Sequence, residues 1–218
     1  MKKLYIFDLD GTLVDSLYDL ADAVNTVLKA HGFDGHEYEK YKYFVGNGTL
    51  KLIERALPED SRSPEMINSL HAEFTVQYEA HLADKTKAYA GIKELISALK
   101  SRRAKLAVAS NKPDKFTKII VEQTFGKGTF DVVLGKREGV PTKPAPQIME
   151  DILKAAGVKA EDSIHSGDSN VDVATAHNAG IACIGCTWGF RTEEELAEAG
   201  ADMTAHRPED ILILTEKL

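Results

Sequence analysis

Cysteine is scarce in this sequence, and long hydrophobic runs are missing. The 218 residues include only Cys183 and Cys186, which argues against a disulfide-stabilised secreted fold and favours a reducing compartment. Only a short apolar run separates Met1-Lys2-Lys3 from Asp8, so no signal peptide is recognisable, and no run approaches the length of a membrane-spanning helix. These absences predict a soluble cytoplasmic protein with no membrane partner.

An excess of positive charge is also missing. Lys and Arg number 27 against 34 Asp and Glu, a formal net charge of -7 at pH 7. Nucleic acids and anionic membranes bind basic faces, so neither is expected as a partner. A small anionic substrate is compatible with this charge, because one bound cation reverses the sign of a cleft locally. The apolar fraction of 43% is enough for a packed core.

The most informative segment that is present is Leu4-Tyr5-Ile6-Phe7-Asp8-Leu9-Asp10-Gly11-Thr12. Its apolar run predicts a buried strand over residues 3–7. Acids that follow such a strand lie at the edge where open α/β sheets bind ligands. Asp8 and Asp10 are two positions apart, so they lie on the same side of an extended chain and repel each other. A bound cation or a shared proton usually accounts for such a pair.

Helical periodicity dominates the chain from residue 15 to 85. The apolar spacing predicts helices over residues 17–31, 38–44, 49–57 and 64–83. Ser63 is expected as the N-cap of the last of these, with Pro64 at its first position. No strand is expected in this stretch, which therefore predicts an all-helical unit.

Strands alternate with helices after residue 85. We expect strands over residues 105–110, 130–134, 163–166 and 181–186. We expect helices over residues 91–103, 114–124, 146–156 and 171–179, then one capped by Thr192 with Glu195 and a last one opened by Pro208. This alternation predicts a Rossmann-like α/β fold with a mostly parallel sheet and helices on both faces. The predicted core domain is residues 1–14 and 86–218, with residues 15–85 inserted as a second domain.

Four polar clusters follow predicted strands or lie close to them. They are Asp8 with Asp10, Ser110 with Asn111, Lys143 before Pro144, and Gly167-Asp168-Ser169-Asn170-Val171-Asp172. The carboxyl ends of parallel strands share one edge of the sheet, so residues far apart in sequence are expected to converge there.

These clusters suit phosphoryl transfer through a covalent intermediate. A carboxylate such as Asp8 is a competent nucleophile toward phosphorus. Mg²⁺ offsets the repulsion between carboxylate and phosphate, and it requires oxygen ligands. Asp8 and Asp168 can supply two carboxylate oxygens. The carbonyl of Asp10 can supply a third ligand, because Gly11 permits a tight turn.

The remaining polar residues can act on the phosphate and on the leaving group. Lys143 adds a positive charge for the phosphate oxygens. Ser110 and Asn111 are expected to bind the phosphate as well, by donating to the oxygens that gain charge in the transition state. Ester cleavage leaves an alkoxide, and Asp10 is placed to protonate it and later to take a proton from water. The sequence therefore predicts Mg²⁺-dependent hydrolysis of a small phosphorylated metabolite.

In order and content, the four clusters resemble the signature motifs of the haloacid dehalogenase (HAD) superfamily. The resemblance implies that Asp8 is the nucleophile and Asp10 the acid/base. It also implies that Ser110 and Lys143 bind phosphate and that Asp168 is a metal ligand.

The resemblance extends to supporting residues and to the insertion. It implies that Asp172, with Ser169 beside it, orients Lys143 or a metal-bound water. The helical segment of residues 15–85 resembles the family's cap domain, which closes over the active site. Dehalogenases and the phosphonate-cleaving branch lack an aspartate at the position of Asp10, so its presence implies phosphate-ester chemistry.

Two cap segments and one core segment resemble phosphoglycolate phosphatases. They are Phe44-Val45-Gly46-Asn47-Gly48, Leu52-Ile53-Glu54-Arg55-Ala56-Leu57 and Thr187-Trp188-Gly189-Phe190. In that case the backbone amides of Gly46, Asn47 and Gly48, or the side chain of Arg55, would bind the carboxylate of 2-phosphoglycolate. An ordinary turn at residues 46–48 and a solvated helix face at Arg55 are the alternatives.

Other functions stay open at this point. A sugar-phosphate mutase or a pyrophosphatase would share the core residues, and only the cap and its linkers would distinguish them. A receiver-type signalling module also groups acids, a hydroxyl and a Lys around Mg²⁺, but the helical insertion and Asp10 argue against it. Cys183 and Cys186 lack a second ligand pair, so no zinc or redox site is expected. A monomer and a homodimer are both compatible with the sequence.

Overall fold

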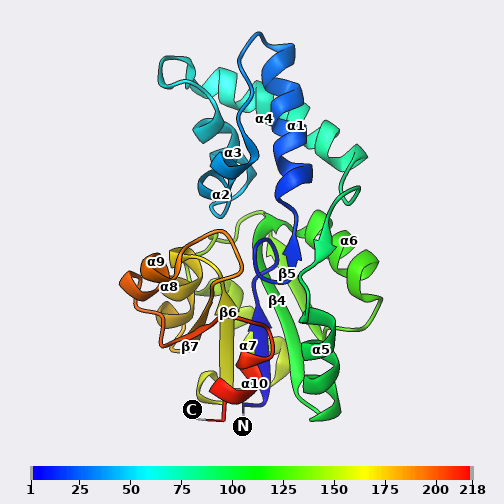
Figure 1. Cartoon of the computed structure of the whole chain (residues 1–218), viewed down its shortest axis with the longest axis vertical. Helices are drawn as coiled ribbons and strands as arrows, with labels where there is room; N and C mark the ends of the chain where they lie inside the picture. The colour runs from blue at the N-terminus through cyan, green and yellow to red at the C-terminus, as the bar shows by residue number, and fades with distance from the viewer. Residues whose placement is uncertain (1, 217–218) are drawn as a thin grey trace.

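The computed structural model describes residues 2–216 and consists of two lobes joined by two linkers (Figure 1). The larger lobe is a parallel sheet covered by helices. The smaller lobe holds α1 to α4, and we call it the helical lobe. The chain leaves the sheet after β1 (Leu4–Phe7), passes through β2 (Val14–Asp15) into the helical lobe, and returns through β3 (Lys87–Ala88). Strands β2 and β3 pair antiparallel, so the two linkers run side by side.

The six-stranded sheet has the order β5-β4-β1-β6-β7-β8. Its other strands are β4 (Lys105–Pro113), β5 (Val132–Lys136), β6 (Ser163–Gly167), β7 (Ala182–Cys186) and β8 (Met203–Ala205). All neighbouring pairs are parallel. Phe7 lies opposite Val108 on one side and Ser166 on the other. The residues that follow β1, β4 and β6 therefore emerge at one edge of the sheet.

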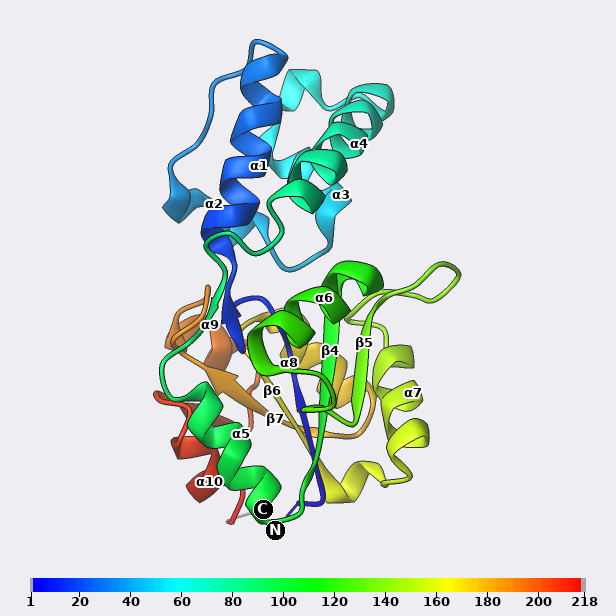
Figure 2. The same cartoon turned by 90° about the vertical axis from the view of Figure 1, so that its right-hand side faces the viewer.

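Helices cover both faces of the sheet (Figure 2). They are α5 (Ile92–Ser101), α6 (Asp114–Phe125), α7 (Gln147–Ala156), α8 (Asn170–Asn178), α9 (Glu193–Glu198) and α10 (Asp210–Leu214). Along β1, Leu4 and Ile6 belong to the apolar cluster that includes α7 and α8 residues, whereas Tyr5 and Phe7 belong to the cluster that includes α5 and α6 residues. Side chains alternate between faces in a strand, so a strand covered on both sides is apolar throughout.

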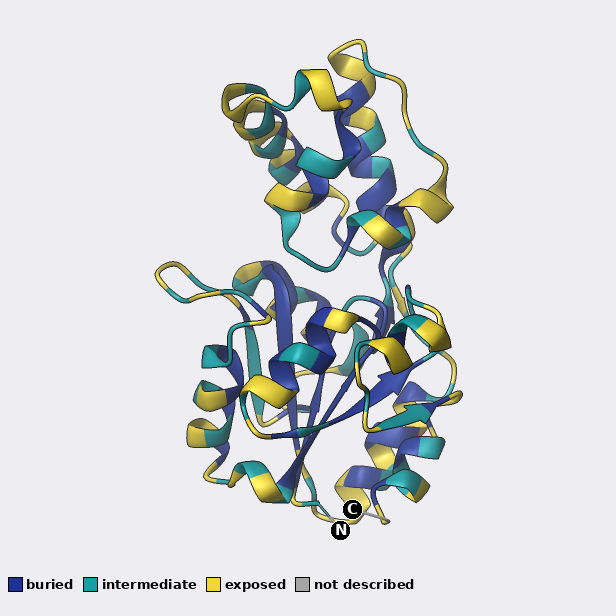
Figure 3. Ribbon diagram, turned by 90° about the vertical axis from the view of Figure 1, so that its left-hand side faces the viewer, coloured by how far each residue is buried: buried dark blue, intermediate teal, exposed yellow. Residues whose placement is uncertain are grey.

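The helical lobe consists of α1 (Leu17–Ala30), α2 (Tyr38–Phe44), α3 (Thr49–Ala56) and α4 (Pro64–Ala80). The buried faces of these helices point toward one another (Figure 3). In α1 the apolar residues recur at helical spacing, and Leu20, Val24 and Leu28 are buried in the same cluster as Phe74 and Tyr78 of α4. This shared core holds the helical lobe together.

A buried carboxylate fastens the two linkers to each other. Asp19, in the first turn of α1, accepts hydrogen bonds from Lys85 N (3.0 Å), Thr86 N (2.8 Å) and Thr86 Oγ1 (2.7 Å). The outgoing and returning chains are thereby joined where they cross between the lobes.

The helix and strand pattern expected from the sequence is confirmed, with small shifts at the ends. Ser63 caps α4 by accepting from Met66 N at 3.2 Å, and Thr192 with Glu195 forms the expected capping box. The sequence did not indicate β2, β3 or β8. These strands are two or three residues long and depend on pairing with distant segments, so no local periodicity marks them. No helix within residues 2–216 is both long enough and apolar enough to cross a bilayer.

Candidate active site

Asp8 is held in a fixed orientation at the end of β1. Its carboxylate Oδ1 accepts a hydrogen bond from Leu9 N (2.7 Å) and lies 2.9 Å from Lys143 Nζ. The other oxygen, Oδ2, accepts no hydrogen bond from residues 2–216, and Asp8 lines the main cleft between the lobes. One carboxylate oxygen is therefore restrained, while the other is available to a reacting group.

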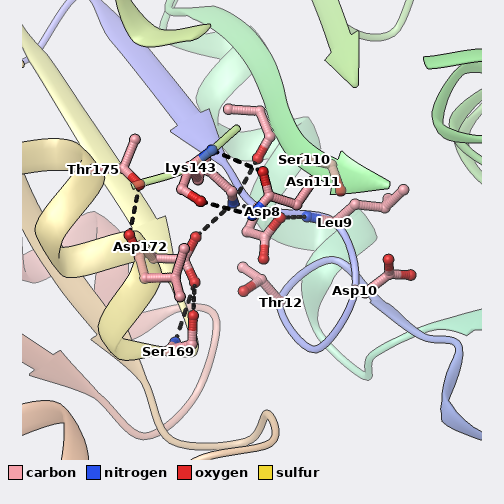
Figure 4. Close-up of polar contacts among 12 residues, drawn as sticks. Asp8, Leu9, Asp10, Thr12, Ser110, Asn111, Lys143, Ser169, Asp172 and Thr175 are labelled. Carbon is pink, nitrogen blue, oxygen red and sulfur yellow. Dashed lines mark hydrogen bonds and ion pairs between the residues drawn. The ribbon is translucent and has the colours of Figure 1, made fainter. Parts of the chain in front are cut away.

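Lys143 is the buried cation of the site (Figure 4). Its ammonium group contacts Asp8 at 2.9 Å, Asp172 at 2.7 Å and the carbonyl of Ala109 at 2.9 Å. Its backbone is held by Asn111, whose Oδ1 accepts from Lys143 N at 2.8 Å and whose Nδ2 donates to Lys143 O at 3.1 Å. Although burial opposes the charged form, Asp172 and Asp8 raise the pKa of Lys143, so it stays charged.

Both oxygens of Asp172 are occupied. Oδ1 binds Lys143 and lies 3.3 Å from His165 Nε2. Oδ2 accepts from Ser169 Oγ at 2.6 Å and from Ser169 N at 3.2 Å. Against the effect of burial, Lys143 holds the pKa of Asp172 below its ordinary value. Asp172 is thus an ionised group that orients Lys143, and Ser169 and His165 orient Asp172.

Asp168 lies close to Asp8 because two glycines leave room for it. It accepts from Phe190 N at 2.7 Å and is 2 % exposed. A Cβ at Gly11 would lie 2.3 Å from Asp168 Oδ2, and one at Gly189 would lie 2.3 Å from Asp168 Cβ. Any side chain at either position would therefore push Asp168 away from β1.

The site holds more negative charge than its own cations neutralise. Asp8, Asp168 and Asp172 each offer a carboxylate oxygen within 4.8 Å of the others. Burial and the charge of Asp172 raise the pKa of Asp8 to about 7, although Lys143 opposes the shift. Burial, Asp172 and Asp8 raise the pKa of Asp168 well above its ordinary value. A divalent cation would favour the ionised forms, and an all-oxygen donor set fits Mg²⁺.

Asp10 points away from Asp8 (Figure 4). Its Oδ1 accepts from Ser16 Oγ at 2.5 Å, and both of its oxygens lie 2.9 Å from Lys112 Nζ. Lys112 is buried, and its Nζ lies 5.0 Å from the ring centroid of Tyr78 in α4. Lys112 therefore connects Asp10 in the core to Tyr78 in the helical lobe.

Lys112 is a site residue that our sequence interpretation missed. A usable signal was present, because Lys112 is two positions after Ser110 in an extended segment and so shares its side of the strand. Lys112 N donates to Ser110 Oγ at 3.2 Å, which leaves the Ser110 hydroxyl hydrogen available to another acceptor.

The loop of residues 46–48 closes one side of the cleft, and Arg55 does not line it. Gly46 and Gly48 line the cleft, and Gly46 O accepts from Asn111 Nδ2 at 3.0 Å. Arg55 donates from Nη1 to Tyr43 O and Phe44 O and from Nη2 to Asn47 Oδ1 at 2.8 Å. Arg55 therefore fixes the shape of the loop.

A second missed residue, Arg191, lines the same cleft from the sheet side. Its Nη1 donates to Lys42 O and its Nη2 to Val45 O at 3.3 Å, both in the helical lobe. The guanidinium carbon lies 5.0 Å from the ring centroid of Tyr43. In the sequence it only follows Phe190 in a predicted loop, and no motif marked it.

The sheet order, the inserted helices and the acid-rich strand ends together define a class of protein. The haloacid dehalogenase-like hydrolase family matches residues 5–186, and the chain belongs to this family. The fold class and the family resemblance predicted from the sequence are both confirmed. Hydrolases of this family generally use Mg²⁺, which agrees with the buried acid cluster.

Curated relatives of the chain include phosphoglycolate phosphatases. The chain is similar to a phosphoglycolate phosphatase from Vibrio parahaemolyticus, with 33% identity over 215 residues that cover 96% of this chain and 94% of that protein. It is 31% identical over 217 residues to phosphoglycolate phosphatase 1 from Pseudomonas aeruginosa, covering 97% and 79%. The solved structure of a candidate phosphoglycolate phosphatase from Lactobacillus delbrueckii matches with a TM-score of 0.92 at 32% identity, covering 97% of both chains.

Proposed function

We propose that the protein is a Mg²⁺-dependent phosphatase that cleaves small phosphate monoesters through an aspartyl-phosphate on Asp8. The observation that carries this proposal is the asymmetry of the Asp8 carboxylate. Lys143 and Leu9 N hold Oδ1, and Oδ2 is left to attack phosphorus. The names of the relatives support 2-phosphoglycolate as the leading substrate.

The phosphate would be held by donors that are already oriented. Lys143 supplies a buried positive charge that Asp172 keeps in place. Ser110 keeps its hydroxyl hydrogen available, because its oxygen is engaged by Lys112 N. Donors fixed before the reaction stabilise developing charge without reorganising.

Asp8 and Asp168 are the carboxylates that would hold Mg²⁺, with the carbonyl of Asp10 as a third protein ligand. Asp172 is left out of this set because Lys143 and His165 share one of its oxygens and two Ser169 donors share the other. Asp168 has only one close donor, Phe190 N, besides the longer contact from Thr12 Oγ1 at 3.4 Å. When bound, the ion offsets the repulsion between the Asp8 carboxylate and the phosphate dianion.

Asp10 lines the cleft but faces Ser16 and Lys112, so to act as the acid/base it would turn toward Asp8. In its neutral form it would protonate the departing alkoxide, and as the resulting carboxylate it would take a proton from the water that hydrolyses the aspartyl-phosphate. Leu20, Val45, Leu52 and Phe190 line the cleft and would exclude other water from the reaction. In this proposal residues 15–85 act as a cap on a core formed by residues 1–14 and 86–218. The linkers β2 and β3, joined by Asp19, would be its hinge.

A phosphate-release screen over phosphorylated metabolites, with and without Mg²⁺, tests the proposal. We expect multiple turnovers with small monoesters only when Mg²⁺ is present. A phosphoprotein that forms once and decays slowly, without turnover, would instead indicate a signalling module. Transfer of phosphate within a sugar would indicate a mutase.

Binding of Mg²⁺ is also expected to show in thermal stability. A ligand that binds only the folded state raises Tm. We therefore expect Mg²⁺ to raise the Tm of the wild type and to have a much smaller effect on Asp168→Asn, measured by calorimetry. The exposed Asp34→Asn variant serves as the control and should respond as the wild type does. An undiminished shift in Asp168→Asn would remove Asp168 from the metal site.

Arg55→Ala is expected to lower kcat/KM for 2-phosphoglycolate about tenfold, mostly through KM, since the change removes hydrogen bonds that shape the loop. Steady-state kinetics measure this effect. Arg62→Ala is the matched control, because Arg62 bonds only Leu57 O and Glu59 within the described chain. Unchanged kinetics in Arg55→Ala would show that Arg55 does not shape the loop for catalysis.

A further inference from the structure

Arg191 enters the cleft from a rigid part of the core. Its neighbour Phe190 donates its backbone N–H to Asp168 Oδ2 at 2.7 Å, which fixes the chain beside the acid cluster. The side chain then reaches the helical lobe, where its guanidinium meets Lys42 O and Val45 O. Arg191 is therefore positioned both by the proposed catalytic centre and by the loop that closes over it.

Arg191 has no carboxylate in direct contact, unlike the other cations at the site; it acts on Asp168 only through space, where it opposes the rise in the pKa of that carboxyl. Lys143 is paired with Asp8 and Asp172, and Lys112 is paired with Asp10. Within residues 2–216, Arg191 makes no ion pair: its partners are the carbonyls of Lys42, Val45 and Phe190 and the ring of Tyr43. The cleft thus carries one cation whose donors are not occupied by a carboxylate.

Arg55 strengthens this positive region. Its hydrogen bonds also go to uncharged acceptors, namely Tyr43 O, Phe44 O and Asn47 Oδ1. Two guanidinium groups near each other, neither paired with a carboxylate in the described chain, repel each other. An incoming anion would relieve that repulsion.

The free donors of Arg191 suit a carboxylate. An arginine side chain has five N–H groups in a planar fork. Within the described residues, Nε–H and at least one Nη2–H of Arg191 have no acceptor. Two such groups can bind both oxygens of one carboxylate, which a point charge such as Lys cannot match.

The other walls of the cleft would not select a second charged group. On the side of the helical lobe they carry no charged side chain and are formed by Leu20, Val45, Gly46, Gly48, Thr49 and Leu52. Apolar walls also argue against a sugar rich in hydroxyl groups, which would leave polar groups without partners. The substrate that fits is a short monoester with a single acidic group beyond the phosphate.

We infer that Arg191 is the specificity-determining residue of this cleft and binds the carboxylate of a phosphorylated hydroxy acid whose phosphate lies at Lys143 and Ser110. This inference rests on the proposed phosphatase function. It assigns to the core a role that our sequence interpretation gave to the cap.

Two substrates that differ only in the carboxylate test the inference. They are 2-phosphoglycolate and ethyl phosphate, in which a methyl group replaces the carboxylate. In Arg191→Met we expect kcat/KM for 2-phosphoglycolate to fall about 10²-fold, since the carboxylate loses a half-buried charged partner. For ethyl phosphate we expect a fall of only about threefold, from the lost contact with the helical lobe. The ratio of kcat/KM for 2-phosphoglycolate to kcat/KM for ethyl phosphate should therefore fall sharply.

Further variants separate specificity from cap positioning. Arg191→Lys keeps the charge but loses the fork, so its ratio should lie between those of the wild type and Arg191→Met. Arg55→Lys keeps the positive charge but loses hydrogen bonds that hold the loop, so it should lower kcat/KM for both substrates by the same factor. If Arg191→Met lowers kcat/KM for both substrates by the same factor, so that their ratio is unchanged, the inference is overturned and the phosphatase proposal stays intact. A wild type that releases phosphate from neither substrate would overturn the proposed function itself.

Discussion

Asp8→Asn should abolish phosphate release and leave the fold intact. The amide has the shape of the carboxylate and can still accept from Leu9 N, but it is not a nucleophile. We expect kcat to fall at least about 10⁴-fold, as is typical when a group that forms the covalent intermediate is removed. Steady-state phosphate release measures the loss, and circular dichroism with thermal unfolding verifies the fold.

The pKa of Asp8 also predicts the direction in which the stability of Asp8→Asn changes. Burial and Asp172 raise the pKa of Asp8 to about 7, so with no metal bound the folded state loses stability as the pH rises from about 4, the pKa of an unfolded Asp, to about 7, and the loss is complete above that pH. An uncharged Asn removes this penalty, and Tm in the absence of Mg²⁺ should not fall. Asp162→Asn, which removes an exposed acid paired with Lys3, is the control and should retain full activity. Retained turnover in Asp8→Asn would defeat the mechanism.

Lys143→Met has the second largest expected effect, on both stability and activity. The substitution leaves Asp8 and Asp172 buried without the cation that contacts both. Breaking a buried ion pair by removing one partner costs about 3–5 kcal/mol, because the remaining charge is uncompensated. Activity should fall as well, since the phosphate loses its buried positive charge. Urea unfolding measures the first effect, and kinetics well below Tm measure the second.

Lys3→Met is the matched control for this change. Lys3 also pairs with a carboxylate, that of Asp162 at 2.9 Å, but its side chain is 68% exposed. Exposed pairs contribute about 0–1 kcal/mol, so the control should unfold almost as the wild type does. Mg²⁺ should restore part of the stability of Lys143→Met, because the ion would neutralise Asp8, one of the two acids left without Lys143. A Lys143→Met variant as stable and as active as the wild type would contradict the role given to Lys143.

The core of the site could be predicted from the sequence because its residues follow buried strands. Asp8, Ser110 and Asp168 come after apolar runs, and parallel pairing of β1 with β4 and β6 brings those ends to one edge. The helical insertion could be predicted as well, from its periodicity and from the cap of α4 by Ser63. These features follow from local patterns and from one rule of sheet topology.

The residues that join the two lobes could not be predicted in the same way. Arg191 contacts Val45 and Lys112 contacts Tyr78, and each partner lies far away in the sequence. Only these contacts identify the two residues as part of the site. The direction of the Arg55 side chain depends on the loop that it holds, and a helical pattern alone does not fix it. Contacts between the two lobes depend on how the lobes are placed against each other. The periodicity of a single sequence does not indicate that placement.

Trapping the intermediate tests the central mechanism most directly. The wild type is mixed with a radiolabelled phosphate monoester and Mg²⁺ and quenched in acid within one turnover. The protein-bound label is counted, and in a parallel sample borohydride reduction releases the phosphate and converts the phosphorylated Asp to homoserine, whose position is mapped. We predict that phosphate is bound to the protein at Asp8 and that Asp8→Asn carries none. Continuous turnover without protein-bound phosphate, or label on another residue, would contradict the account.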